Sequence, residues 1–210
     1  MSIQHRYVCN PANASLTGFA TDVTGATWTL TATAPTDGFA HQVSIRNDSV
    51  TDHSAKTVVL VGTDYAGAAL TQTINLPGNG ATVESTAYFK TLTSATPSAT
   101  IGADTMDIGW VDEYIPQPIM LNHNDWAGAL IQVVVTGTVN YDIEVTAAER
   151  RYIVDGTALW SHTTTSALVN ATASILGQLE PHVTAARLTV NSYTDGLALT
   201  IYVSESSLER

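Results

Sequence analysis

The sequence predicts an all-β protein of short antiparallel strands, packed as β-sandwich domains of jelly-roll or immunoglobulin-like type. Threonine accounts for 32 of the 210 residues, whereas charged residues make up only 13%. Threonine is β-branched and suits a pleated, half-exposed surface better than a helix. Apolar and polar residues also alternate, and Asp, Gly and Pro interrupt the apolar stretches at short intervals. That rhythm is typical of sandwiches and barrels.

The clearest strand pattern covers residues 131–146. Odd positions from Ile131 to Val145 are apolar apart from Gly137, and even positions are polar apart from Val134. A period of two predicts strands with one buried and one solvated face. Because strands usually run about 3–10 residues, we expect a break within residues 136–140, either a hairpin or a bend at Gly137.

Two hairpins are predicted where apolar segments flank a loop that carries Asp and Gly. The first joins residues 56–62 to 69–76, and the second joins residues 186–191 to 197–203. Residues 166–179 have apolar side chains at helical spacing but also Thr and Val, so a short helix and an ordered loop fit equally well. Further strands are predicted at residues 26–34, 38–46, 87–94 and 105–111.

A domain boundary is predicted at residues 112–118, where two prolines cannot donate to a β-ladder and hold the preceding residues extended. We therefore expect two β-sandwich domains in tandem, residues 1–114 and residues 119–210. A single continuous sandwich that crosses this point is the alternative. Residues 1–21 carry few strand signals and are expected to form an N-terminal arm.

The balance of charge limits the partners that the chain can have. Its net charge is −11, from 19 acidic and 8 basic residues, and Arg150–Arg151 is the only adjacent basic pair. Such a surface repels phosphate backbones, so no nucleic-acid partner is expected. No apolar run approaches the roughly 18 residues of a spanning helix, so no membrane partner is expected either.

The compartment is predicted from the N-terminal residues and the cysteine count. Residues 1–10 lack the apolar segment of a secretory signal. Cys9 is the only cysteine, so the chain has no intrachain disulfide. We expect synthesis in a cytoplasm.

No catalytic, cofactor-binding or metal-binding motif is recognisable, and we expect neither an enzyme nor a cofactor nor a metal. The chain has no GxSxG elbow and no glycine loop that could cradle a phosphate. The densest acidic stretch, Asp104, Asp107, Asp112 and Glu113, offers the oxygen ligands that Ca²⁺ prefers, but its spacing is that of a solvated loop. The histidines show no metal-ligand spacing. They are His5, His41, His53, His123, His162 and His182.

Two aromatic residues are candidates for contact with a glycan or a protein partner. Trp126 ends the polar turn at residues 122–126, an arrangement that a sugar could stack on. Tyr193 lies in the loop of the second predicted hairpin and offers a similar ring. The alternative for Trp126 is that the ring packs its loop onto the edge of a sandwich.

Three segments resemble the strand-and-turn pattern of structural proteins of tailed bacteriophages. They read "VVLVGTDYAGAALTQTINLPG" from residue 58, "ESTAYFKTLTSATPSATIGADTMDIGW" from residue 84, and "ARLTVNSYTDGLALTIYVSES" from residue 186. The resemblance implies a virion protein that is made in the host bacterial cytoplasm and assembled in many symmetric copies. It also implies a homo-oligomer whose partners are other virion proteins, either the major capsid protein or neck and tail proteins.

Three functions follow as hypotheses. The first is a capsid decoration or cement protein that stabilises the head. The second is a component of the head–tail neck, the collar or the tail. The third is a carbohydrate-binding module for host attachment, in which Trp126 or Tyr193 contacts the glycan.

Overall fold

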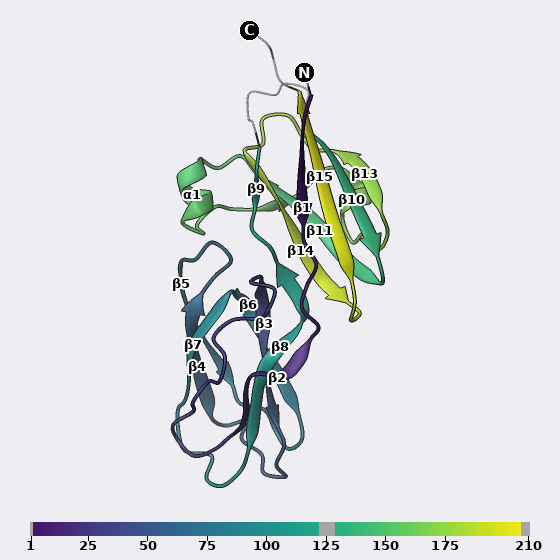
Figure 1. Ribbon diagram of the computed structural model, residues 1–210. Coiled ribbons are helices and arrows are strands. Elements are labelled where there is room, and N and C mark those ends of the chain that lie inside the picture. The colour runs from purple at the N-terminus through teal and green to yellow at the C-terminus, as the bar shows by residue number, and fades with distance from the viewer. Residues whose placement is uncertain (1, 122–128, 207–210) are drawn as a thin grey trace. The chain divides into compact units, whose positions relative to one another are not determined.

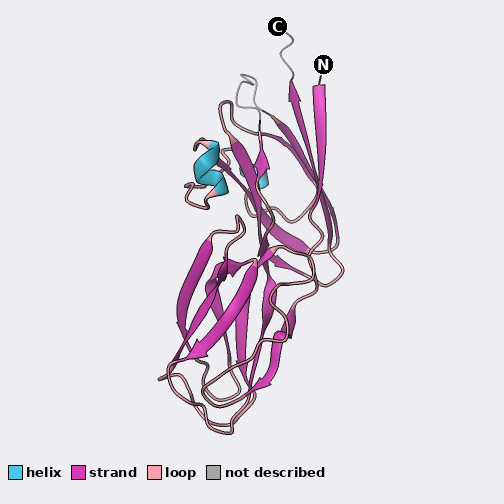
Figure 2. Cartoon of the chain, turned by 60° about the vertical axis from the view of Figure 1, so that its left-hand side comes forward, coloured by secondary structure: helices cyan, strands magenta, loops and turns pink. Residues whose placement is uncertain are grey.

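The computed structural model describes residues 2–121 and 129–206, and in this part the protein is all-β, as predicted. The helical segments there are α1 (Arg150–Val154) and a single 3-10 turn, η1 (Ser166–Leu168), drawn in cyan in Figure 2. The chain divides into two compact units. Unit N is Ala12–Tyr114, and unit C combines Met1–Pro11 with Ile115–Arg210. Whether each unit folds alone as a domain stays a prediction.

Unit N is a sandwich of two antiparallel sheets (Figure 1). One sheet has the order β8-β3-β6 with β2 paired to β8, and the other has the order β5-β4-β7. Its strands are β2 (Ser15–Val23), β3 (Ala40–Asn47), β4 (Thr57–Thr63), β5 (Ala69–Asn75), β6 (Thr82–Phe89), β7 (Thr91–Pro97) and β8 (Met106–Ile115).

The core of unit N lies between its two sheets. Val43 and Ile108 from one sheet and Leu60 and Leu92 from the other belong to one buried cluster, and all four are fully inaccessible to solvent. Burying such a side chain contributes about 1.5–3 kcal/mol. Gly109 allows β2 to approach β8, because a Cβ there would lie 1.8 Å from the Ser15 carbonyl oxygen.

Unit C also contains two antiparallel sheets, with orders β1-β15-β10-β13 and β12-β11-β14, and β9 pairs with β14 (Figure 1). Apolar side chains alternate inward along β10 and β11, so that Ile131 and Ile143 are fully buried. The strands are β1 (Ser2–Val8), β9 (Ile119–Met120), β10 (Leu130–Thr136), β11 (Val139–Thr146), β12 (Ser161–His162), β13 (Ile175–Gln178), β14 (Ala185–Tyr193) and β15 (Ala198–Ser206).

The predicted break in residues 131–146 is a bend at Gly137 and not a hairpin. Gly137 has φ of 113°, and it separates β10 from β11, which belong to different sheets. The second predicted hairpin is wrong for the same reason. Its two strands exist as β14 and β15, but the turn at Gly196 (φ 81°) carries the chain from one sheet to the other, and β15 pairs with β1 and β10.

The first predicted hairpin is confirmed, since β4 and β5 pair antiparallel from Thr57↔Asn75 to Thr63↔Ala69. The predicted strand at residues 26–34 is absent. The backbone N–H groups of Thr31 and Ala32 both donate to the Phe19 carbonyl oxygen, at 2.8 and 3.2 Å, and so form no ladder.

Three other expected elements take a different form. Residues 87–94 span two strands, because Lys90 turns out of line and its N–H donates to the Thr63 carbonyl oxygen at 2.8 Å. Residues 166–179 form η1, a loop and the short strand β13. Residues 2–8, expected as part of an arm with few strand signals, form β1, which pairs along its length with β15 of the same chain. This pairing places residues 1–11 in unit C.

Candidate functional site

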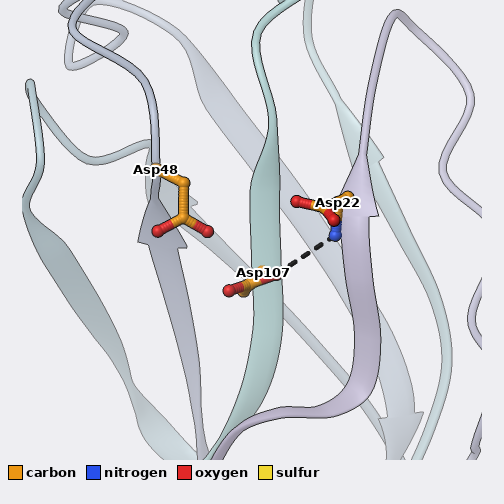
Figure 3. Close-up of side chains that lie close together, drawn as sticks. All are labelled: Asp22, Asp48 and Asp107. Atoms are coloured by element: carbon orange, nitrogen blue, oxygen red, sulfur yellow. Dashed lines mark hydrogen bonds between the residues drawn. The ribbon is translucent and has the colours of Figure 1, made fainter.

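Three carboxylates meet at the surface of unit N, on segments far apart in the sequence. Asp22 lies in β2, Asp48 directly follows β3, and Asp107 lies in β8. One carboxylate oxygen from each lies within 4.8 Å of the others, and Figure 3 shows Asp107 between the other two. The backbone N–H of Asp22 donates to Asp107 Oδ1 at 3.1 Å. We call these residues the acidic cluster.

The surroundings of Asp107 and Asp48 shift the pKa values of these two carboxyl groups in opposite directions. Asp107 is buried, and burial raises the pKa of its carboxyl group; the neighbouring Asp48 raises it further. Burial acts in the same direction on Asp48, but the hydrogen bonds with Arg46 and Asp107 and the charge of Arg46 together outweigh it, and the pKa of Asp48 is lowered. Arg46 Nε donates to Asp48 Oδ1 at 2.6 Å, and its Nη2 lies 3.9 Å from Asp107 Oδ2. A guanidinium therefore already supplies positive charge to the acidic cluster.

The acidic stretch seen in the sequence does not form one group. Asp107 joins Asp22 and Asp48, whereas Asp104 pairs with His53 and Glu113 accepts a hydrogen bond from the Tyr88 hydroxyl at 3.2 Å. Three carboxylates could supply oxygen ligands to a hard cation such as Ca²⁺. Sequence spacing does not predict this cluster, because strand pairing alone brings residues 22, 48 and 107 together.

His41 forms a buried ion pair in unit N. Its Nε2 lies 2.8 Å from Asp37 Oδ2, its Nδ1 lies 3.1 Å from the Val111 carbonyl oxygen, and its side chain is fully inaccessible. Both ring nitrogens face oxygen atoms that can accept a hydrogen bond. The ring stacks on Tyr114 at 5.5 Å between centroids, which adds a favourable aromatic contact.

His53 has the opposite arrangement. Lys56 Nζ lies 3.0 Å from Nδ1, which must accept, and Nε2 lies 2.9 Å from Asp104 Oδ2, to which it donates. This pattern fits a neutral imidazole with its proton on Nε2. Because each ring nitrogen already has a partner, neither can take a proton from a substrate without breaking a contact. His41 and His53 therefore hold the fold together.

The polar face of unit C is formed by side chains of β11 and β14 that satisfy one another. Arg187 Nε donates to Glu144 Oε2 at 2.7 Å, and its guanidinium stacks over Trp160 at 4.6 Å from the ring centroid. Asn191 Nδ2 donates to Asp142 Oδ2 at 2.7 Å. These contacts cross from strand to strand and stabilise the sheet.

Of the two aromatic residues predicted as partner contacts, Tyr193 lies in the described part of the chain. Tyr193 is the last residue of β14, lies opposite Val139, and is only 6% exposed. A ring this deeply buried presents little of its face for a sugar to stack on. Trp126 lies outside the described residues. Contact of either residue with a glycan or a partner stays a prediction.

The outer face of the four-stranded sheet of unit C carries four exposed aliphatic side chains among polar ones. The register brings Val8, Thr200 and Val134 into one row across the sheet, and Leu176 lies opposite Gln132. Leu176 is 67%, Val8 50% and Val134 36% exposed. We call this surface the sheet face. Its outward side chains are Gln4, Arg6, Val8, Leu130, Gln132, Val134, Leu176, Gln178, Thr200, Tyr202 and Ser204.

No protein-family model matches the chain, and a search of curated proteins finds no match. Over residues 2–121 and 129–206, none of the helical segments is long and apolar enough to cross a bilayer.

Proposed function

We propose that this chain is a virion structural protein of a tailed phage, and that it decorates the capsid and stabilises the head. The observation that carries a structural role is the sheet face, a surface suited to contact with another protein. The virion assignment comes from the resemblance of three sequence segments to phage structural proteins. The partners are then other virion proteins, above all the major capsid protein, together with further copies of this chain.

The sheet face differs from the rest of the surface in both charge and exposure. The chain carries 19 acidic residues, yet none is among the outward side chains of this face, where Arg6 is the only charged group. Leu130 adds a further large apolar side chain that is 49% exposed. Contiguous exposed apolar surface rimmed by polar residues marks interaction sites. A partner that covers this face gains the burial of four aliphatic side chains, and none of the outward side chains is a carboxylate.

The edges of the same sheet support assembly as well. β1 and β13 are the outermost strands of the order β1-β15-β10-β13. Edge strands carry unpaired backbone groups that can pair with another chain. A decoration protein present in many copies can use the sheet face and these edges together.

Incorporation into virions tests the proposal. Leu176→Glu places a carboxylate on the sheet face, in its edge strand β13, and we expect it to reduce incorporation into particles produced by the phage that carries the gene. Leu159→Glu is the matched control, because Leu159 is 89% exposed and lies outside the sheet face. If the wild-type chain is absent from virions, or if Leu176→Glu is incorporated as well as Leu159→Glu, the proposal is wrong.

Copy number decides where in the particle the protein acts. Hundreds of copies per virion, measured by gel densitometry against the major capsid protein, support head decoration. About a dozen copies or fewer match the symmetry of a neck or tail ring and support a neck, collar or tail component. Particles that lack the protein should also release their DNA at lower temperature if it stabilises the head.

A further inference from the structure

A cavity in unit C lies away from the sheet face. Its volume is about 470 Å³, and it is lined by Met120, Leu121, Ala147, Glu149, Arg150 and Thr184. These residues come from β9 and the position after it, from the segment between β11 and α1, from the first residue of α1, and from the segment before β14. Pockets for small molecules usually measure about 300–1,000 Å³. The cavity is therefore large enough for a small organic molecule.

The charged side chains beside the cavity differ in whether they have a partner of opposite charge. Arg151 Nε lies 3.1 Å from Glu149 Oε2, its Nη2 donates to the Tyr152 hydroxyl at 3.0 Å, and its guanidinium stacks over the Tyr152 ring at 4.6 Å. Glu149 thus has a cationic partner of its own. The Arg150 side chain, in contrast, makes no hydrogen bond or ion pair with any residue in the described part of the chain. The uncompensated charge on the lining is positive.

The remaining polar atoms of the lining are engaged in the fold. Thr184 Oγ1 donates to the carbonyl oxygens of Thr146 and Ala148, at 3.0 and 2.6 Å. The Leu121 N–H donates to the Thr184 carbonyl oxygen at 2.9 Å. The side chains of Met120, Leu121 and Ala147 are apolar. Arg150 is therefore the group on the lining best able to recognise a ligand by charge, and the walls beside it suit an apolar body.

We propose that this cavity binds a small amphipathic organic anion, whose carboxylate pairs with the Arg150 guanidinium and whose apolar body packs against Met120 and Leu121. Arginine presents its donors in a planar fork that matches a carboxylate. The pairing would give a net-negative chain one site that attracts an anion. This site is independent of the proposed virion role, because it shares no residue with the sheet face.

A matched pair of probes separates charge recognition from apolar contact. 1-Naphthylacetate and its neutral analogue 1-naphthylacetamide have the same ring and nearly the same size. We expect the full chain to bind the carboxylate saturably, with amide shifts in the ¹⁵N–¹H NMR spectrum at Leu121, Ala147 and Thr184. The carboxamide should bind about tenfold more weakly, because it lacks the charge-assisted hydrogen bonds to arginine.

The two adjacent arginines provide the matched variants. Arg150→Gln should weaken binding of 1-naphthylacetate about tenfold and leave binding of the carboxamide unchanged, whereas Arg151→Gln should leave the carboxylate affinity unchanged. The proposal is overturned if the wild-type chain shows no saturable binding, if the carboxamide binds as well as the carboxylate, or if Arg150→Gln has no effect. Equal losses in both variants would also overturn it. Leu176→Glu should not change this binding, so the outcome is independent of the virion test.

Discussion

Asp37→Asn is the substitution expected to destabilise unit N most specifically. The Asp37 side chain is 6% exposed, and its carboxylate accepts three hydrogen bonds: from Ala12 N–H at 2.6 Å, from Phe39 N–H at 2.8 Å and from His41 Nε2 at 2.8 Å. An asparagine side chain has only one acceptor oxygen. Whichever way its amide is turned, its NH₂ group faces a donor, and the buried His41 ring loses its carboxylate partner.

The expected cost follows from the burial of both partners. Removing one member of a buried ion pair costs about 3–5 kcal/mol, because the other charge is left uncompensated. We expect Asp37→Asn to lower the free energy of unfolding of unit N by that amount at pH 7. His41→Gln should also destabilise, and the double variant should cost about 1–3 kcal/mol less than the sum of the single variants, since the partners are coupled.

Urea unfolding followed by tryptophan fluorescence measures these quantities. Trp28 and Trp110 belong to unit N, so a background that carries Trp126→Phe and Trp160→Phe reports on that unit alone. Although burial raises the pKa of Asp37, the hydrogen bonds from His41 and the two backbone amides outweigh it and the pKa is lowered. The stabilisation is therefore complete above the ordinary aspartate pKa of about 3.9 and is lost as the pH falls through the lower folded value. A cost of Asp37→Asn below about 1 kcal/mol at pH 7, or strict additivity, would refute the ion-pair assignment.

Three other predictions test separate parts of the molecule. Gly109→Ala should destabilise unit N by about 3 kcal/mol or more, because the Cβ would lie 1.8 Å from the Ser15 carbonyl oxygen. Gly102→Ala is the control: its Cβ would meet no atom within 4 Å, but its φ is +71°. It should cost only about 1–2 kcal/mol in the same urea assay. Burial raises the pKa of the Cys9 thiol to about 12 and leaves it 4% exposed, so Ellman's reagent at pH 8 should modify Cys9 only after unfolding. Asp107→Asn keeps the acceptor for the Asp22 N–H and removes a buried charge. Because burial raises the pKa of Asp107, the variant should melt at a higher temperature than the wild type at pH 7. The difference in melting temperature should vanish as the pH falls to about 4.

The strands were more predictable from sequence than their partners. Alternation identified the buried face of β10 and β11, because each inward side chain is set by the local pleat. The pairing of β14 and β15 was not predictable in the same way. The turn at Gly196 has the composition of a hairpin, but β15 is paired on both edges, by β1 and β10, so the chain crosses to the other sheet. Whether β15 has an edge free to pair with β14 depends on the whole sheet, and no local sequence pattern predicts it.

The candidate sites show the same limit. Asp37 and His41 are four residues apart, but the Val111 carbonyl that completes the pair is 70 residues further on, so sequence alone suggested only an ordinary histidine. The acidic cluster depends on the pairing of β2 with β8 and on the end of β3. Arg150–Arg151 was visible as the only basic pair, yet the difference between the two side chains depends on where Tyr152 and Glu149 lie.

The distribution of charge links the sheet face to the cavity and also distinguishes them. Arg46, Lys56 and Arg187 contact acceptors of their own chain, so part of the small cationic charge is already engaged, and the chain carries a net charge of −11. Two negative bodies repel each other, and salt screens that repulsion while it leaves apolar burial intact. Association through the sheet face should therefore strengthen as salt is added. Binding of an anion at Arg150 depends on the attraction itself, so salt should weaken it. Ionic strength thus acts in opposite directions on the two surfaces, which would not be so if both were non-specific apolar patches.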